Sequence, residues 1–192
     1  MELQRGVMGD RASFPELAAA AADRDIVAHA QRLLAAFRAA GRPVVHCVAE
    51  FRADRAGTWT NTPLHSAVLR RPEHLLEGTA ATELVPGLGA ETTDYVSARR
   101  HGVAPFTGTP LHELLQGLGV RVLAVAGVSV NLGVLGLCVE AVNLGYQVVV
   151  ATDAVVGIPL DYADAVLNNS IGLVASLHSV DDIADALATL TR

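Results

Sequence analysis

The chain has 192 residues and a mass of 20.0 kDa, which suits one domain with a real hydrophobic core. Its formal net charge is −6, and aromatic residues make up only 4%. Because there is also no cluster of basic residues, these values argue against nucleic-acid binding, both through charge and through base stacking. Hydrophobic residues make up 51%, yet no apolar run approaches the length of a membrane span.

The sequence shows no signal for export. Residues 1–10 are polar, and no apolar segment of the signal-peptide type follows them. The two cysteines, Cys47 and Cys138, lie in apolar runs and define no disulfide framework. We therefore expect a reduced, cytoplasmic protein.

The N-terminal half predicts helices and a strand, followed by an irregular segment. Residues 15–40 have helical periodicity, with a potential break at residues 23–25, and residues 43–49 form an apolar run typical of a strand. Residues 50–72 are polar and irregular, which is typical of a functional lid or interface. An equally good interpretation is a surface excursion with one short helix at residues 64–69.

The C-terminal half predicts a regular alternation of strands and helices. Residues 94–98 form a short predicted strand, and Thr109 followed by proline marks the start of a helix. Farther along, the patterns predict a helix over residues 161–175, a short strand over 176–178 and a closing helix over 179–190.

The centre of the chain predicts a β-α-β unit. Residues 119–126 and 146–151 are short, β-branched runs typical of buried strands, and residues 130–144 between them are apolar over a helix length. The whole order predicts a three-layer α/β/α fold, a mostly parallel, doubly wound, Rossmann-like sheet in one domain over residues 1–192. Because pockets of open α/β sheets lie beyond the carboxyl ends of the strands, we expect any chemistry in the loop 127–133.

Three motifs resemble the isochorismatase-like (cysteine hydrolase) superfamily. They are GVSVNLGVLGLCVEAVNLGY at 127–146, FTGTPLHELL at 106–115 and ELQRG at 2–6. The resemblance covers almost the whole chain. It implies that the first, central strand ends at the acidic residue of ELQRG, and only Met1 precedes that residue here. We expect either a very short strand or, as the favoured alternative, a natural chain that begins upstream.

The resemblance implies a catalytic triad of an acid, a lysine and a nucleophilic cysteine. The motifs place Glu2 at the acid position, Arg100 at the lysine position and Gly133 at the cysteine position, so all three members differ. Arg100 is selected by counting back from Phe106, whereas counting forward from Asp94 selects Arg99. Without a thiol at position 133, the acyl-enzyme mechanism of the amidases in this superfamily is lost.

A glycine at the cysteine position is still compatible with activity. The isochorismatases proper and their relatives of phenazine biosynthesis look the same there, and they hydrolyse a vinyl ether by acid catalysis, which needs a carboxylic acid and a pocket. We therefore predict acid-catalysed hydrolysis of a small carboxylated metabolite of the enol-ether type. Glu2 is the predicted acid, and Arg100 either holds a substrate anion or pairs with Glu2. The alternative is a non-catalytic member that binds a small molecule or has a structural role.

Further residues are candidates for substrate binding. Val128 and Ser129 match a non-proline cis peptide of the superfamily, and the amides from Asn131 to Gly133 are expected to bind an anion or a carbonyl oxygen, unless they form an ordinary helix start. The other candidates are Gln4, Phe51, Arg52 and Trp59.

No metal site or cofactor is predicted. The segment EFRADR at 50–55 lacks the histidines of the metal motif found in nicotinamidase-type members. His46, near a strand end, is interpreted as a structural histidine rather than a pocket residue. The expected partners are a small, anionic substrate and further copies of the chain in a homo-oligomer, with neither nucleic acid nor a membrane.

Overall fold

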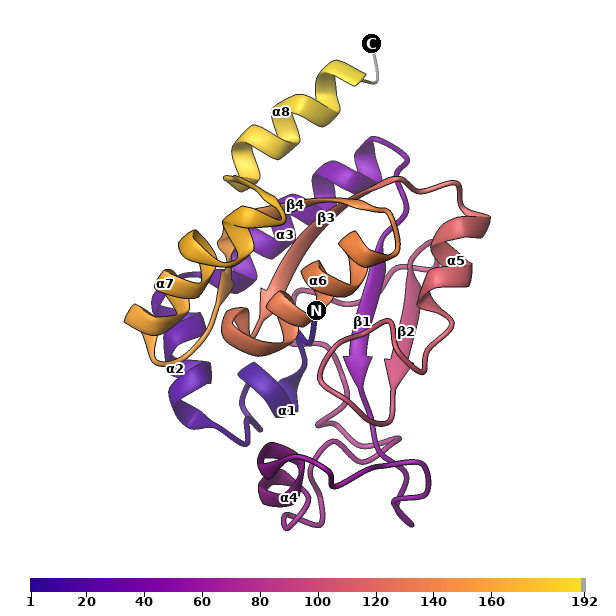
Figure 1. Ribbon diagram of the computed structural model, residues 1–192, viewed down its shortest axis with the longest axis vertical. Coiled ribbons are helices and arrows are strands. Elements are labelled where there is room, and N and C mark those ends of the chain that lie inside the picture. Colours follow the sequence, from indigo (N-terminus) through magenta and orange to yellow (C-terminus); the bar gives the residue numbers. More distant parts are fainter. Residues whose placement is uncertain (191–192) are drawn as a thin grey trace.

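The computed structural model describes residues 1–190, which form an α/β fold of parallel strands and helices (Figure 1). One sheet has the strand order β1-β2 and the other the order β3-β4-β5, with every neighbouring pair parallel. The strands are β1 Val45–Ala49, β2 Tyr95–Arg99, β3 Val122–Val128, β4 Gln147–Val156 and β5 Ser176–His178.

Helices connect the strands, as parallel neighbours require. They are α1 Arg5–Met8, α2 Pro15–Asp23, α3 Ile26–Ala39, α4 Pro63–Val68, α5 Leu111–Gly117, α6 Leu135–Asn143, α7 Leu160–Asn169 and α8 Val180–Leu190, with a π-helical turn η1 Val130–Val134 and a 3₁₀ turn η2 Ile171–Leu173. None of the helices within residues 1–190 is long and apolar enough to span a membrane.

Helices cover both faces of the β3-β4-β5 sheet. Along β4, Val148 and Val150 pack in a core cluster with side chains of α5, α6 and α7, whereas Val149 and Ala151 pack with side chains of α3 and α8. Side chains of successive strand residues point to opposite faces, so these two clusters lie on opposite sides of the sheet. The predicted three-layer α/β/α arrangement is confirmed.

The first residues of the chain lie between β1 and β3. The amino group of Met1 donates to the carbonyl of Ala126 (2.7 Å), the carbonyl of Met1 accepts from the Val128 amide (3.0 Å), and the Glu2 amide donates to the carbonyl of Cys47 (2.8 Å). This contact requires glycine at position 127, because a Cβ there would lie 2.0 Å from the Met1 carbonyl oxygen. Residues 1–3 therefore link the two sheets where the superfamily resemblance implies a central strand.

The predicted elements agree with the structure except at their ends. The predicted helix over residues 15–40 divides at Arg24 and Asp25 into α2 and α3. The predicted helix over residues 130–144 begins with the π-helical turn η1, and β4 continues to Val156, beyond the predicted strand end at residue 151. The short helix α1 was not predicted, because four residues are too few for a periodic pattern.

His46 belongs to a buried charge cluster and not to a pocket. Its Nε2 lies 2.9 Å from Oδ2 of Asp94, which also accepts from Arg38, and only 1% of the Asp94 side chain is exposed. Burial raises the pKa of Asp94, but the hydrogen bonds from Arg38 and His46 outweigh burial and hold this pKa at about 2. The cluster ties α3 to the amino-terminal ends of β1 and β2, so the structural interpretation of His46 is confirmed.

We predict that Asp94→Asn lowers the free energy of unfolding by about 2 kcal/mol at pH 7, since the carboxylate is more stable in the folded chain than in the unfolded one. A depressed pKa gives stability that is present above the unfolded value, near pH 4, and is lost toward pH 2. The difference between wild type and variant, measured by urea unfolding, should therefore shrink over that range. The control is Glu91→Gln, which removes a mostly exposed partner of Arg38 and should change stability by less than about 0.5 kcal/mol. Equal losses in both variants would contradict this account.

Candidate active site

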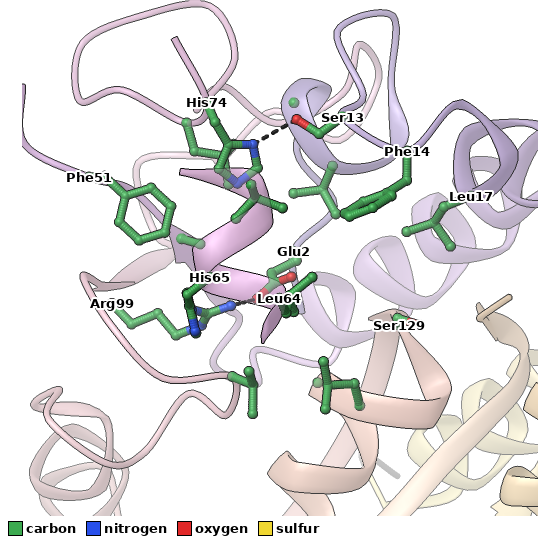
Figure 2. Close-up of a pocket in the computed structure, with 18 of the residues that line it drawn as sticks. Glu2, Ser13, Phe14, Leu17, Phe51, Leu64, His65, His74, Arg99 and Ser129 are labelled. Carbon is green, nitrogen blue, oxygen red and sulfur yellow. Dashed lines mark hydrogen bonds and ion pairs between the residues drawn. The ribbon is translucent and has the colours of Figure 1, made fainter. Parts of the chain in front are cut away.

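A cavity of about 240 Å³ lies beside the carboxyl ends of β1, β2 and β3 and is lined in part by residues of α4 (Figure 2). This is the position expected for a pocket in an open α/β fold. Its walls are largely apolar, and they come from the N-terminal segment, the start of α2, α4 and the turn η1. The apolar side chains that line it include Phe14, Leu17, Phe51, Leu64, Val68 and Leu75.

Glu2 and Arg99 form an ion pair inside this cavity. Nη2 of Arg99 donates to Oε1 of Glu2, and only 9% of the Arg99 side chain and 13% of the Glu2 side chain are exposed. Glu2 has a φ of +52°, in the left-handed region that side chains other than glycine rarely adopt. Such backbone conformations concentrate at functional sites, where the surrounding structure holds them in place.

Arg99, and not Arg100, therefore occupies the lysine position next to Glu2. Along β2 the side chains alternate, so Ser97 and Arg99 are buried whereas Arg100, just past the strand, is exposed and donates to Glu77 at 3.3 Å. The choice of Arg100 from the motif spacing does not fit this geometry. Arg99 also has a buried Nε with no hydrogen-bond partner among residues 1–190.

Gly133 lines the same cavity as Glu2 and Arg99. It lies in the π-helical turn η1, a conformation that often occurs at functional sites. A Cβ at this position would lie 3.1 Å from Cε of Met1 and 3.4 Å from the carbonyl oxygen of Val128. The acid, lysine and cysteine positions inferred from the resemblance thus converge on one cavity.

Two polar side chains shape the loop before η1. The Val128–Ser129 peptide is cis, as the resemblance implied. Ser129 Oγ donates to Asn131 Oδ1 (2.5 Å), and Asn131 Nδ2 donates to the carbonyl of Ile158 (3.2 Å). Gly157 makes room for this arrangement, because a Cβ there would lie 2.5 Å from Asn131 Oδ1.

The fold and these motifs agree with known proteins. The chain matches the isochorismatase domain over residues 2–182. It belongs to the isochorismatase family. An uncharacterised isochorismatase family protein of Escherichia coli O157:H7, YecD, is 31% identical over 166 residues, which cover 85% of this chain and 84% of the relative.

Solved structures give the same result for the fold. An isochorismatase family protein from Desulfovibrio vulgaris has a TM-score of 0.82 and 27% identity, with 97% of this chain and 95% of that chain covered. N-carbamoylsarcosine amidase from Thermoplasma acidophilum has a TM-score of 0.72 at 20% identity, with 94% and 93% covered. The second similarity concerns the fold alone.

Several predicted substrate-binding residues of this isochorismatase family chain do not line the cavity. Gln4 is fully buried and braces the fold, since its amide donates to the carbonyls of Ala49 and Thr82. Arg52 is exposed and pairs with Asp54. Val128 is fully buried. Trp59 is 55% exposed and stacks on His101. Phe51, Ser129 and Asn131 do line the cavity.

Three polar residues of the cavity were not predicted from the sequence, namely Ser13, His65 and His74. His65 Nδ1 lies 2.8 Å from Thr62 Oγ1, and His74 Nδ1 lies 2.7 Å from Ser13 Oγ. Burial, then the charge of Arg99, lowers the pKa of His65. His65 lies in α4, and His74 lies in the segment that follows this helix. His65 falls within residues 50–72, the segment predicted as a lid, an interface or a surface excursion, whereas no sequence signal pointed to His74.

Neither cysteine is placed to act as a nucleophile. Cys47 and Cys138 are free and buried, and none of the described residues that line the cavity is a cysteine. Burial raises the pKa of both thiols, that of Cys138 to about 12. The thiolate is the reactive form, so both thiols are inert near neutral pH.

Within residues 1–190, no three histidine, cysteine, aspartate or glutamate side chains come together in an arrangement able to hold a metal ion. The sequence-based expectation of no metal therefore stays a prediction.

We predict that Gly133→Cys folds and places a thiol in the cavity, at a cost of about 1 kcal/mol or less, because the close contact is with the flexible end of Met1. Under native conditions the variant should react once with a chromogenic disulfide reagent. The wild type should react only after denaturation, when both of its cysteine thiols become accessible to the reagent. Rapid reaction of the native wild type would contradict the burial of Cys47 and Cys138.

Proposed function

We propose that this member of the isochorismatase family is a hydrolase that works by acid catalysis, without a cysteine nucleophile. The observation that carries the proposal is the position of Glu2. It is the only carboxylic residue among the described residues that line an otherwise largely apolar cavity. The proposed substrate is a small carboxylated molecule with an enol-ether bond, of which isochorismate is an example.

The proposed reaction uses one oxygen of Glu2 for orientation and the other for proton transfer. Oε1 accepts from Arg99, and no side chain of residues 1–190 hydrogen-bonds to Oε2. In the reaction, a proton passes from Oε2 to the alkene carbon, which leaves an oxocarbenium ion. Water adds to this ion, the hemiketal breaks into a ketone and an alcohol, and the proton returns to Glu2.

Arg99 has two proposed roles in this scheme. Its ion pair holds the Glu2 carboxyl group in one orientation, which the backbone of Glu2 alone would not do. Its free Nε is a buried donor for an oxygen of the substrate. Because the ion pair with Glu2 neutralises much of the positive charge of Arg99, the substrate carboxylate needs a further binding group.

The second candidate is a non-catalytic, ligand-binding member, and the same ion pair favours it. General acid catalysis needs a proton on the Glu2 carboxyl group, whereas the hydrogen bond from the Arg99 guanidinium is the contact of a carboxylate. In this case the cavity would still bind small anions, but no hydrolysis would occur across a panel of carboxylated enol ethers, esters and amides.

We predict that Glu2→Gln lowers kcat for a carboxylated enol ether by at least about 100-fold, since general acid catalysis contributes this much or more. The matched control is Glu77→Gln, which removes an exposed carboxylate that pairs with Arg100. It should keep wild-type activity. Unchanged turnover in Glu2→Gln would exclude Glu2 as the acid, and no turnover by the wild type on any member of the panel would favour the non-catalytic candidate.

We also predict different effects for the two neighbouring arginines. Arg99→Met should lower kcat/KM by at least about tenfold, because it removes a charge-assisted hydrogen bond to Glu2. Arg100→Met should change kcat/KM by less than about twofold, because its ion pair is exposed. The reverse order, measured by steady-state kinetics, would restore the assignment of Arg100 to the lysine position.

A further inference from the structure

The cavity contains a second polar pair besides Glu2 and Arg99. Ser13 Oγ and His74 Nδ1 lie 2.7 Å apart, and both residues line the cavity. Figure 2 shows this pair well separated from the Glu2–Arg99 pair, with the side chains of both pairs inside the same pocket. The proposed reaction uses the Glu2 end of the cavity and gives the Ser13–His74 end no role.

The pair retains one hydrogen-bond donor for a ligand, whichever tautomer His74 adopts. A neutral imidazole and a hydroxyl group carry two polar hydrogens, and their mutual hydrogen bond uses one. If Ser13 donates to Nδ1, the Nε2–H of His74 remains free. If Nδ1–H donates to Ser13, the hydroxyl hydrogen remains free. No hydrogen bond to His74 Nε2 is found within residues 1–190.

Two arginines make the surroundings of this pair positive. Arg55 donates to the carbonyl of His74 (3.2 Å), and Arg71 donates to the carbonyl of Ser13. Neither guanidinium forms an ion pair with a carboxylate of residues 1–190. Burial, then the charges of Arg55 and Arg71, lowers the pKa of His74 to about 4. Two guanidinium groups without a carboxylate partner among residues 1–190 thus lie beside the pair, in a chain whose net charge is −6.

The same end of the cavity has aromatic walls. Arg55 lies over the ring of Phe51, at 5.5 Å from its centroid, and Arg71 lies over the ring of Phe14, at 6.0 Å. Both rings line the cavity together with Leu17. These walls give the Ser13–His74 end of the cavity the apolar surface that the ring of a small cyclic ligand requires.

We propose that the Ser13–His74 pair is the subsite that binds the carboxylate of the substrate. The free donor of the pair forms a charge-assisted hydrogen bond with the carboxylate, and the unpaired charges of Arg55 and Arg71 stabilise it. The apolar ring of the substrate then lies between the pair and the Glu2–Arg99 end. The orientation of the reacting bond toward Glu2 rests on the proposed function, whereas binding of the carboxylate does not.

Calorimetric titration with benzoate and its uncharged analogue benzamide tests this subsite. Neither probe has an enol-ether bond, so the result is independent of whether Glu2 is a catalytic acid. Wild-type protein should bind benzoate at least about tenfold more tightly than benzamide. In the double variant Ser13→Ala/His74→Phe, which removes both potential donors and keeps a ring, this preference should fall to less than about threefold.

A pair of neighbouring arginines gives a second test that leaves Ser13 and His74 intact. Arg71→Gln keeps a donor for the Ser13 carbonyl but removes the charge, and Arg70→Gln makes the same change in net charge at an exposed neighbour. Benzoate affinity should fall at least about threefold in Arg71→Gln alone. This comparison also decides the question if the double variant does not fold.

Three results would overturn the proposal. They are an undiminished preference for benzoate in the double variant, equal effects of Arg70→Gln and Arg71→Gln, and no preference for benzoate in the wild type. An undiminished preference with unchanged affinities for both probes would place the carboxylate at Arg99 instead. An undiminished preference with equally weakened binding of benzoate and benzamide would assign the pair a structural role only.

Discussion

The position of Glu2 depends on the hydrogen bonds that hold residues 1–3 between β1 and β3. The backbone of Met1 bonds to both Ala126 and Val128, and the Glu2 amide bonds to Cys47. These bonds satisfy buried backbone groups that would otherwise be costly, and they join two sheets that share no direct strand pairing. They also bring Glu2, the only carboxylic residue among the described residues that line the cavity, next to Arg99 and into the same cavity as Gly133.

The cavity lies between the strand ends, here called its floor, and α4 with the segment after it, here called its roof. Strands β1, β2 and β3 end at the floor, where Gly127 and Gly157 allow backbone and side chains to approach closely. The roof comes from α4 and the segment that follows it, and Arg55 and Arg71 hold this segment by hydrogen bonds to backbone carbonyls. The two polar pairs, Glu2–Arg99 and Ser13–His74, lie apart in this largely apolar cavity.

The sequence predicted the fold well because local patterns determine it. The β-branched run at residues 119–126, the apolar helix after it and the strand that follows gave the central β-α-β unit with small errors at the ends. The cavity itself depends on contacts between distant segments. Ser13 and His74 are 61 residues apart, and no local pattern connects them.

The choice between Arg99 and Arg100 shows a limit of motif spacing. Counting back from Phe106 crosses an irregular loop, in which one residue more or less changes the answer. The alternation of buried and exposed positions in β2 decides the question, since Ser97 and Arg99 share the inner face. That period of two was available in the sequence, but only once the strand boundaries were known.

The central claim is that Glu2 delivers a proton to carbon, and hydrolysis of a carboxylated enol ether in D₂O tests it most directly. Acid catalysis predicts a product with one deuterium at the former alkene carbon, formed by the wild type and not by Glu2→Gln. Product incubated alone in D₂O corrects for spontaneous exchange next to the new ketone. A hydrolysis product that carries no deuterium at this carbon would contradict the account, because water would then have cleaved the bond without protonation of the alkene.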